Sequence, residues 1–208
     1  TFYNVLLMLV ALVDVSKWMA FLLGQIFKKM LGRQNNKNSK REWLWGQKYG
    51  LVPWSLPYNT LRGNTILIHC ASVGEVIGIF PLIKQLMKLQ PEVKFVVTTN
   101  TLTGKQTLLR LMSDSDKNKI YHLYFPLDLP WFMSRLINKL KPKAALIMEV
   151  ELWPNFIRQC NKNQVPVVIV NARLTDKTTN GYRKFSWLCK PMIDSLSMVF
   201  VRNNTDKN

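Results

Sequence analysis

The stretch Leu67–Val76, LIHCASVGEV, decides the fold because its residue pattern changes type within a few positions. An apolar run ends at Ala71, three small or acidic residues follow (Ser72, Gly74 and Glu75), and a helical pattern then begins. A short apolar strand that leads directly into a helix is the opening of a βαβ unit. The stretch therefore raises the question of what a carboxylate does at the end of a buried strand.

The same alternation of strand and helix continues along the chain. We predict strands at 65–71, 93–99, 120–125, 143–149, 165–171 and 197–201, and helices at 76–89, 104–112, 130–140, 154–163 and near 183–195. Short strands separated by helices indicate a parallel sheet, and continuous apolar runs indicate that both of its faces are covered. The predicted fold class is α/β, with a Rossmann-like, doubly wound parallel sheet.

The composition favours a folded, strongly basic protein. Of 208 residues, 48% are hydrophobic and 20% are charged, so a packed core is expected. Lysine and arginine number 29 against 12 acids, a net charge of +17 that indicates an anionic partner: nucleic acid, a phosphorylated ligand or an anionic membrane. The cysteines Cys70, Cys160 and Cys189 form no CxxC pair, which argues against a zinc or redox motif and fits a reducing compartment.

The first part of the chain has the pattern of a membrane anchor. Residues 1–27 contain only two charged side chains, Asp14 and Lys17, and as a helix they would extend about 40 Å, enough to cross a bilayer core. The basic residues that follow place the rest of the chain on the cytoplasmic side. We predict an anchoring helix at 1–27, a basic membrane-proximal connector at 28–60 and a Rossmann-like domain at 61–208. A helix in the membrane interface and a buried core helix are the alternatives.

Polar residues collect where the predicted strands end, which is where such sheets bind ligands. Glu75 is a candidate general base, or alternatively a carboxylate that interacts with a helix N-terminus. Glu149 and Glu151 share one side of an extended segment. They could act in catalysis, form salt bridges or hold a metal ion, although no histidine accompanies them. SVGE is not the GxGxxG pattern of a dinucleotide site.

Two further sets of side chains could either have a structural role or bind a ligand. His69 and His122 lie within predicted strands, and we expect them to be core residues rather than ligands. Arg173, Arg183 and Lys184 could bind an anion or could be solvated surface residues. From these residues alone the prediction reaches a membrane-bound α/β domain with an acidic cleft in basic surroundings, and it names no substrate.

A series of motifs resembles the Kdo transferases of lipopolysaccharide assembly, which move 3-deoxy-D-manno-octulosonic acid from CMP-Kdo to a lipid A precursor. The motifs follow the family's order and spacing. They are REWLWGQKYG (41–50), HCASVGE (69–75), TTNTLTG (98–104), PLDLP (126–130), MEVELWPN (148–155) and NARLTDKTTNGYRK (171–184). The combination of HxxSxGE, ExELWPN and NARL is what makes the resemblance specific.

The resemblance implies the N-terminal half of a two-domain GT-B glycosyltransferase that inverts the anomeric centre without a metal ion or cofactor. Glu75 would be the general base and Glu149 would support the transition state. The lipid A precursor would bind this half, and the acceptor-binding residues would be Ser72, Gly74, Glu151, Arg173, Lys48 and Arg41. CMP-Kdo would bind mainly to a C-terminal domain outside this chain, so the chain alone should not catalyse transfer.

The resemblance also implies a location at the bacterial inner membrane, with the body of the protein on its cytoplasmic face. One alternative is a non-catalytic, membrane-tethered module that binds a phosphorylated lipid. A nucleic-acid-binding protein would explain the charge of +17 but neither the apolar leader nor the acidic rim.

Overall fold

The computed structural model describes residues 3–9, 47, 56–149, 151–173, 179, 182–183 and 186–202. Six strands form its centre, and each predicted strand is present with its ends displaced by no more than two residues. The strands are β1 (Thr65–Cys70), β2 (Lys94–Thr99), β3 (Ile120–Tyr124), β4 (Ala144–Met148), β5 (Val167–Ala172) and β6 (Met198–Val201).

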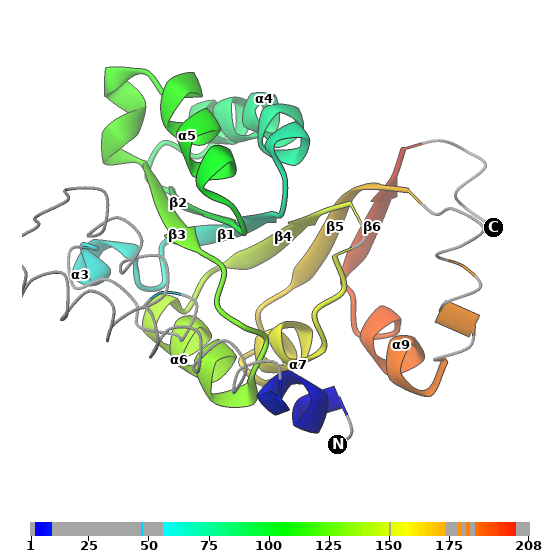
Figure 1. Cartoon of the computed structure of the whole chain (residues 1–208). Coiled ribbons are helices and arrows are strands. Elements are labelled where there is room, and N and C mark those ends of the chain that lie inside the picture. The colour runs from blue at the N-terminus through cyan, green and yellow to red at the C-terminus, as the bar shows by residue number, and fades with distance from the viewer. Residues whose placement is uncertain are drawn as a thin grey trace, which may run out of the picture.

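The strands make one parallel sheet in the order β3-β2-β1-β4-β5-β6. The connecting helices cover both of its faces (Figure 1). They are α4 (Val73–Leu89), α5 (Leu102–Leu111), α6 (Pro130–Leu140), α7 (Pro154–Lys162) and α9 (Ser186–Ile193). Two short elements were not expected from the sequence, α3 (Tyr58–Leu61) and the 3-10 helix η1 (Asp114–Asn118). The predicted doubly wound α/β fold is confirmed.

The sheet separates two apolar cores because successive side chains of a strand point to opposite faces. In β1, Leu67 belongs to the core that includes residues of α6 and α7. Its neighbour Ile68 belongs to the core that includes residues of α4 and α5. All three residues from Leu67 to His69 are almost fully buried, which is why the strand reads as a continuous apolar run.

The start of α4 differs from the prediction. The helix begins at Val73, so Gly74 and Glu75 lie in its first turn rather than in a loop. Ser72 is the N-cap, and Ser72 and Glu75 form a capping box. The Ser72 side chain accepts a hydrogen bond from the Glu75 amide, and the Glu75 side chain accepts one from the Ser72 amide. The sequence S-x-x-E is the signature of this motif, and it moves the helix start three residues towards the strand.

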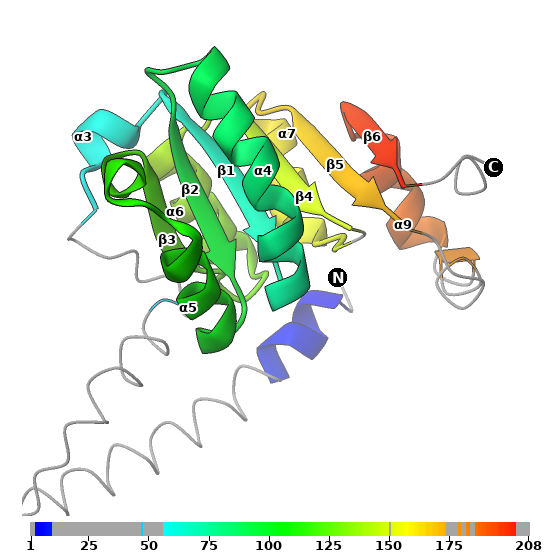
Figure 2. The same cartoon turned by 90° about the horizontal axis from the view of Figure 1, so that it is seen from above.

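The predicted membrane anchor lies mostly outside the described residues. Residues 3–9 form a helix on the side of the domain towards which the strands run (Figure 2). Within the described parts of the chain, none of the helices combines the length and apolar character that crossing a bilayer requires. The anchoring helix at 1–27 and the boundaries at 28–60 and 61–208 therefore stay predictions.

Candidate active site

The strand order places a topological switch point between β1 and β4. From β1 the chain continues to β2 on one side, whereas from β4 it continues to β5 on the other side. In doubly wound sheets, ligands bind at such a switch point, beyond the carboxyl ends of the strands. Glu75 follows β1 in the first turn of α4, and Glu149 follows β4 directly. Two of the predicted rim carboxylates thus flank the switch point.

Glu75 is held in place by the backbone around it. Its side chain is only 6% exposed. One carboxylate oxygen accepts a hydrogen bond from the Ala71 amide at 2.8 Å, and the other accepts one from the Ser72 amide at 3.1 Å. The helix-terminus alternative is therefore confirmed for this residue. A carboxylate has about four acceptor positions, and the two amides occupy two of them.

Glu149 occupies an unusual backbone conformation. Its φ is 57°, in the left-handed region, and its amide donates to the Val170 carbonyl at 2.9 Å. Asn171, at the end of the neighbouring strand, has a φ of 60°. A non-glycine residue there costs about 1–2 kcal/mol, and such strain tends to occur where a side chain is aimed at a functional site. The exposed Glu149 side chain thus leaves the strand at the rim.

Glu151 is electrically coupled to both of these carboxylates. Burial raises its pKa, and the nearby charges of Glu75 and Glu149 raise it further. The three carboxylates therefore share one rim. Neither Glu149 nor Glu151 forms a salt bridge with another described residue, and the described residues contain no cluster of three metal-ligating side chains.

The remaining predicted acceptor-binding residues are only partly described. Ser72 and Gly74 are exposed on the first turn of α4, and a Cβ atom on Gly74 would meet only the Ser72 hydroxyl, at 3.9 Å. Packing therefore does not require glycine at this position. Arg173 is exposed directly after β5. Lys48 and Arg41 lie outside the described residues.

Both histidines are packed within the sheet, as predicted. Nδ1 of His69 lies 2.9 Å from the Thr98 hydroxyl, and Nε2 of His122 lies 2.9 Å from the Thr99 hydroxyl. Burial is the main cause that lowers the pKa of each imidazole to about 3. Both rings are therefore neutral at physiological pH. His69 also packs against Phe125, with 4.0 Å between the ring centroids.

The sequence model described as "3-Deoxy-D-manno-octulosonic-acid transferase (kdotransferase)" matches residues 44–208. The chain belongs to this Kdo transferase family. It is 40% identical over 139 residues to a Haemophilus influenzae 3-deoxy-D-manno-octulosonic acid transferase, covering 67% of this chain and 32% of the relative. It is 32% identical over 142 residues to a Fusobacterium nucleatum bifunctional glycosyltransferase/methyltransferase, covering 68% of this chain and 22% of the relative.

The similarity extends beyond bacteria. A probable mitochondrial 3-deoxy-D-manno-octulosonic acid transferase of Arabidopsis thaliana is 29% identical over 138 residues, which cover 66% of this chain and 30% of the relative. The chain thus spans about a third or less of the length of these curated relatives.

One buried acid of this Kdo transferase chain was not singled out from the sequence. Asp128, in the PLDLP motif, is 1% exposed. Burial raises its pKa to about 6, against the opposing effect of hydrogen bonds from Asn155, Tyr3 and Phe156. An acid between two leucines at the end of a predicted strand was the available signal. Its partners are far away in the sequence, so their identity could not be inferred.

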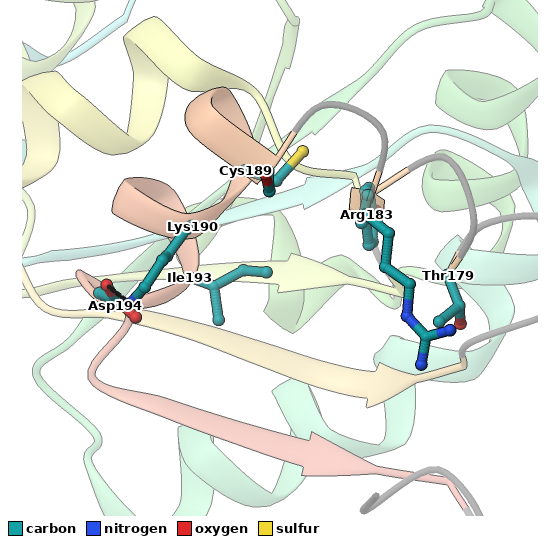
Figure 3. Close-up of a pocket in the computed structure, with 8 residues that line it drawn as sticks. Thr179, Arg183, Cys189, Lys190, Ile193 and Asp194 are labelled. Atoms are coloured by element: carbon teal, nitrogen blue, oxygen red, sulfur yellow. Dashed lines mark hydrogen bonds and ion pairs between the residues drawn. The ribbon is translucent and has the colours of Figure 1, made fainter.

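One described cavity lies at α9, and another lies near the amino end of β3. The first, of about 250 Å³, is lined by residues of α9 and of the segment before it, including Arg183 and the Lys190–Asp194 ion pair (Figure 3). Tyr182 also lines this cavity, and the charge of Glu151 contributes to the raised pKa of its hydroxyl. The charge of Glu151 thus acts on one wall of this cavity. The second, of about 260 Å³, lies between the end of α4 and η1, near the amino end of β3.

Proposed function

We propose that this chain is the acceptor-side half of an enzyme that transfers Kdo from CMP-Kdo to a lipid A precursor in lipopolysaccharide biosynthesis. An acceptor hydroxyl attacks the anomeric carbon of Kdo, the bond from that carbon to the phosphate oxygen breaks, and CMP leaves. Glu75 takes the proton of the hydroxyl. The displacement inverts the anomeric centre and uses no metal ion or cofactor. The observation that carries this proposal is the meeting of three carboxylates at the switch point of a Kdo transferase family domain.

The surroundings of Glu75 suit a general base. A base must be fixed within hydrogen-bonding distance of the proton that it removes. Two backbone amides fix this carboxylate, and they leave acceptor positions for an incoming hydroxyl. The exposed faces of Ser72 and Gly74 beside it would give the acceptor a path to the carboxylate.

The other rim residues would surround the sugar and the acceptor. Glu149 would support the positive charge that develops at the anomeric carbon in the transition state. Glu151 and Arg173 would bind the acceptor, because a carboxylate accepts from sugar hydroxyls and a guanidinium pairs with phosphate. Lys48 and Arg41 would add positive charge for the lipid A phosphates.

The location that we propose is the cytoplasmic face of the bacterial inner membrane. The apolar residues 1–27 would anchor the chain, and the basic connector at 28–60 would contact anionic head groups. This arrangement presents a lipid-borne acceptor to the rim, since residues 3–9 lie on the side of the domain where the strands end (Figure 2).

The test is transfer by the complete gene product in Glu75→Gln, with Glu92→Gln as the matched control. Glutamine can keep the capping box but cannot remove a proton, so Glu75→Gln should lower kcat by about 100-fold or more with little change in stability. Glu92→Gln makes the same change at an exposed acid between α4 and β2, at the opposite end of the strands from the rim. It should leave both stability and activity close to those of wild type.

Two results would contradict the proposal. Equal transfer rates for wild type and Glu75→Gln would remove Glu75 from the chemistry. A complete gene product that retains lipid A precursor in a vesicle-binding assay, yet never transfers Kdo, would instead favour the non-catalytic lipid-binding module.

A further inference from the structure

Asp128, in the loop between β3 and α6, caps the N-terminus of another helix, α7. The N-cap of α7, Trp153, makes no side-chain capping hydrogen bond. Instead, the Asp128 carboxylate accepts from the Asn155 amide at 2.9 Å and from the Phe156 amide at 2.7 Å. The first amides of a helix have no partner within the helix, so this buried acid supplies one from the end of β3.

The same carboxylate also holds the N-terminal helix. The Tyr3 hydroxyl donates to Oδ2 of Asp128 at 2.9 Å. The Asn155 side-chain amide donates to the Asn4 side-chain oxygen at 2.9 Å and to the Asp128 carbonyl. Residues 3 and 4 are thereby fastened to the start of α7, beside which residues 3–9 lie in Figure 1. We call Tyr3, Asn4, Asp128 and Asn155 the clasp.

The clasp fixes which face of the N-terminal helix points outward. Tyr3, Asn4 and Leu7, which are partly buried, share one helical face. The side chains of the other face are apolar and about half exposed: Val5 at 55%, Leu6 at 50%, Met8 at 48% and Leu9 at 53%. A helix of a water-soluble domain normally turns its apolar face inward. Here Tyr3, Asn4 and Leu7 face the domain, and the four other apolar side chains are left outside.

We propose that the clasp positions this outward apolar face for contact with the acyl chains of the bilayer, at a fixed place beside the carboxylate rim. This inference rests on the proposed function. Asn155, the second residue of α7, lies four residues after Glu151, so the clasp joins the membrane-facing helix to the loop that carries the rim acids. The net charge of +17 favours association of the chain with a surface of anionic head groups. Asp128 is thus a positioning residue, which acts through Tyr3 and Asn155.

The test compares Tyr3→Phe with Tyr58→Phe in the complete gene product. Each change removes one tyrosine hydroxyl, but the Tyr58 hydroxyl is buried without a hydrogen-bond partner among the described residues. Kdo transfer is measured with lipid A precursor in phosphatidylethanolamine–phosphatidylglycerol vesicles and, separately, in detergent micelles. Tyr3→Phe should raise the KM for the vesicle-borne acceptor about three- to tenfold, the value of one hydrogen bond, and leave kcat and the micellar KM within about twofold. Tyr58→Phe should change none of these values.

A second readout does not depend on activity. In hydrogen exchange, Tyr3→Phe should speed exchange of the amides of residues 3–9 and leave those of Asn155 and Phe156 protected, whereas Asp128→Asn should speed both. Unchanged exchange at residues 3–9 in Tyr3→Phe overturns the clasp. Equal KM changes in vesicles and micelles would show that the clasp has only a structural role. That result would overturn the proposal that the clasp positions residues 3–9 against the bilayer. Absence of transfer in wild type with the expected exchange pattern would contradict the proposed function but not the clasp.

Discussion

At Glu149 the backbone enters the left-handed region as β4 ends, with a φ of 57°. The side chain is exposed, so no buried contact compensates for the strain. An exposed glutamate gains nothing in stability from this conformation. The conformation is explained if the side chain is needed at the rim, where it adds to the field around Glu151.

Glu149→Asn tests that explanation through stability. Asparagine tolerates the left-handed region better than glutamate does. We expect the free energy of unfolding in urea to stay constant or rise by up to about 1 kcal/mol, while Kdo transfer by the complete gene product falls. A loss of more than about 1 kcal/mol would show that Glu149 stabilises the fold and that its backbone is not strained.

At the scale of elements, the approach of helices to the sheet is set by small residues. Gly104, in the first turn of α5, lies over the end of β2, and a Cβ atom there would come within 3.1 Å of the Thr99 Cβ and 3.2 Å of the Thr101 hydroxyl. Thr101 is itself the N-cap that accepts from the Gly104 amide at 3.1 Å. Gly78, in α4, has more room, since its Cβ would meet only the Met148 methyl at 3.5 Å.

The two glycines should respond oppositely to alanine. Gly104→Ala should lower the free energy of unfolding by about 1–3 kcal/mol, because the new methyl group forces α5 away from β2. Gly78→Ala should raise it by up to about 1 kcal/mol, because alanine favours the helix and meets no tight contact. Chemical denaturation of both variants is the measurement, and the same sign for the two changes would contradict the packing argument.

Elements were predictable from the sequence where the signal was local. The apolar runs of β1 to β6 and the helical patterns between them are local, and so is the S-x-x-E cap that our boundary for α4 overlooked. The two-residue spacing of Glu149 and Glu151 likewise placed both on one rim. The role of Asp128 was not predictable, because it depends on Tyr3 and on α7, which lie 125 and 27 residues away.

For the whole molecule, buried titratable groups tie stability to pH in two directions. The pKa of each histidine falls from 6.5 to about 3 on folding, so their contribution to stability is present above pH 6.5 and is lost as the pH falls towards 3. The pKa of Asp128 rises from 3.8 to about 6, so its contribution is largest below 3.8 and is lost as the pH rises through 6. Acid therefore weakens the fold through the histidines and strengthens it through Asp128.

The protonation of the two histidines can be observed directly by NMR. The chain has only two histidines, so their ring resonances are readily assigned by substituting one of them. We expect neither ring to titrate between pH 8 and about 5, because both are held neutral by burial. A ring that titrates near pH 6.5 in the folded protein would show that its site is open to water.

Asp128→Asn separates the two opposing effects on stability. Between about pH 5.5 and 4.5, two histidines that take up protons only on unfolding should cost about 2.7 kcal/mol per pH unit, and Asp128, which takes one up on folding, should return about half of that. The fall in unfolding free energy with acid should therefore be steeper in Asp128→Asn than in wild type by about 1.4 kcal/mol per pH unit. Urea unfolding at a series of pH values measures both slopes, and their difference cancels the carboxylates that the two proteins share. Parallel curves would mean that Asp128 is already ionised at pH 5 and that its hydrogen bonds from Asn155, Tyr3 and Phe156 outweigh the effect of burial.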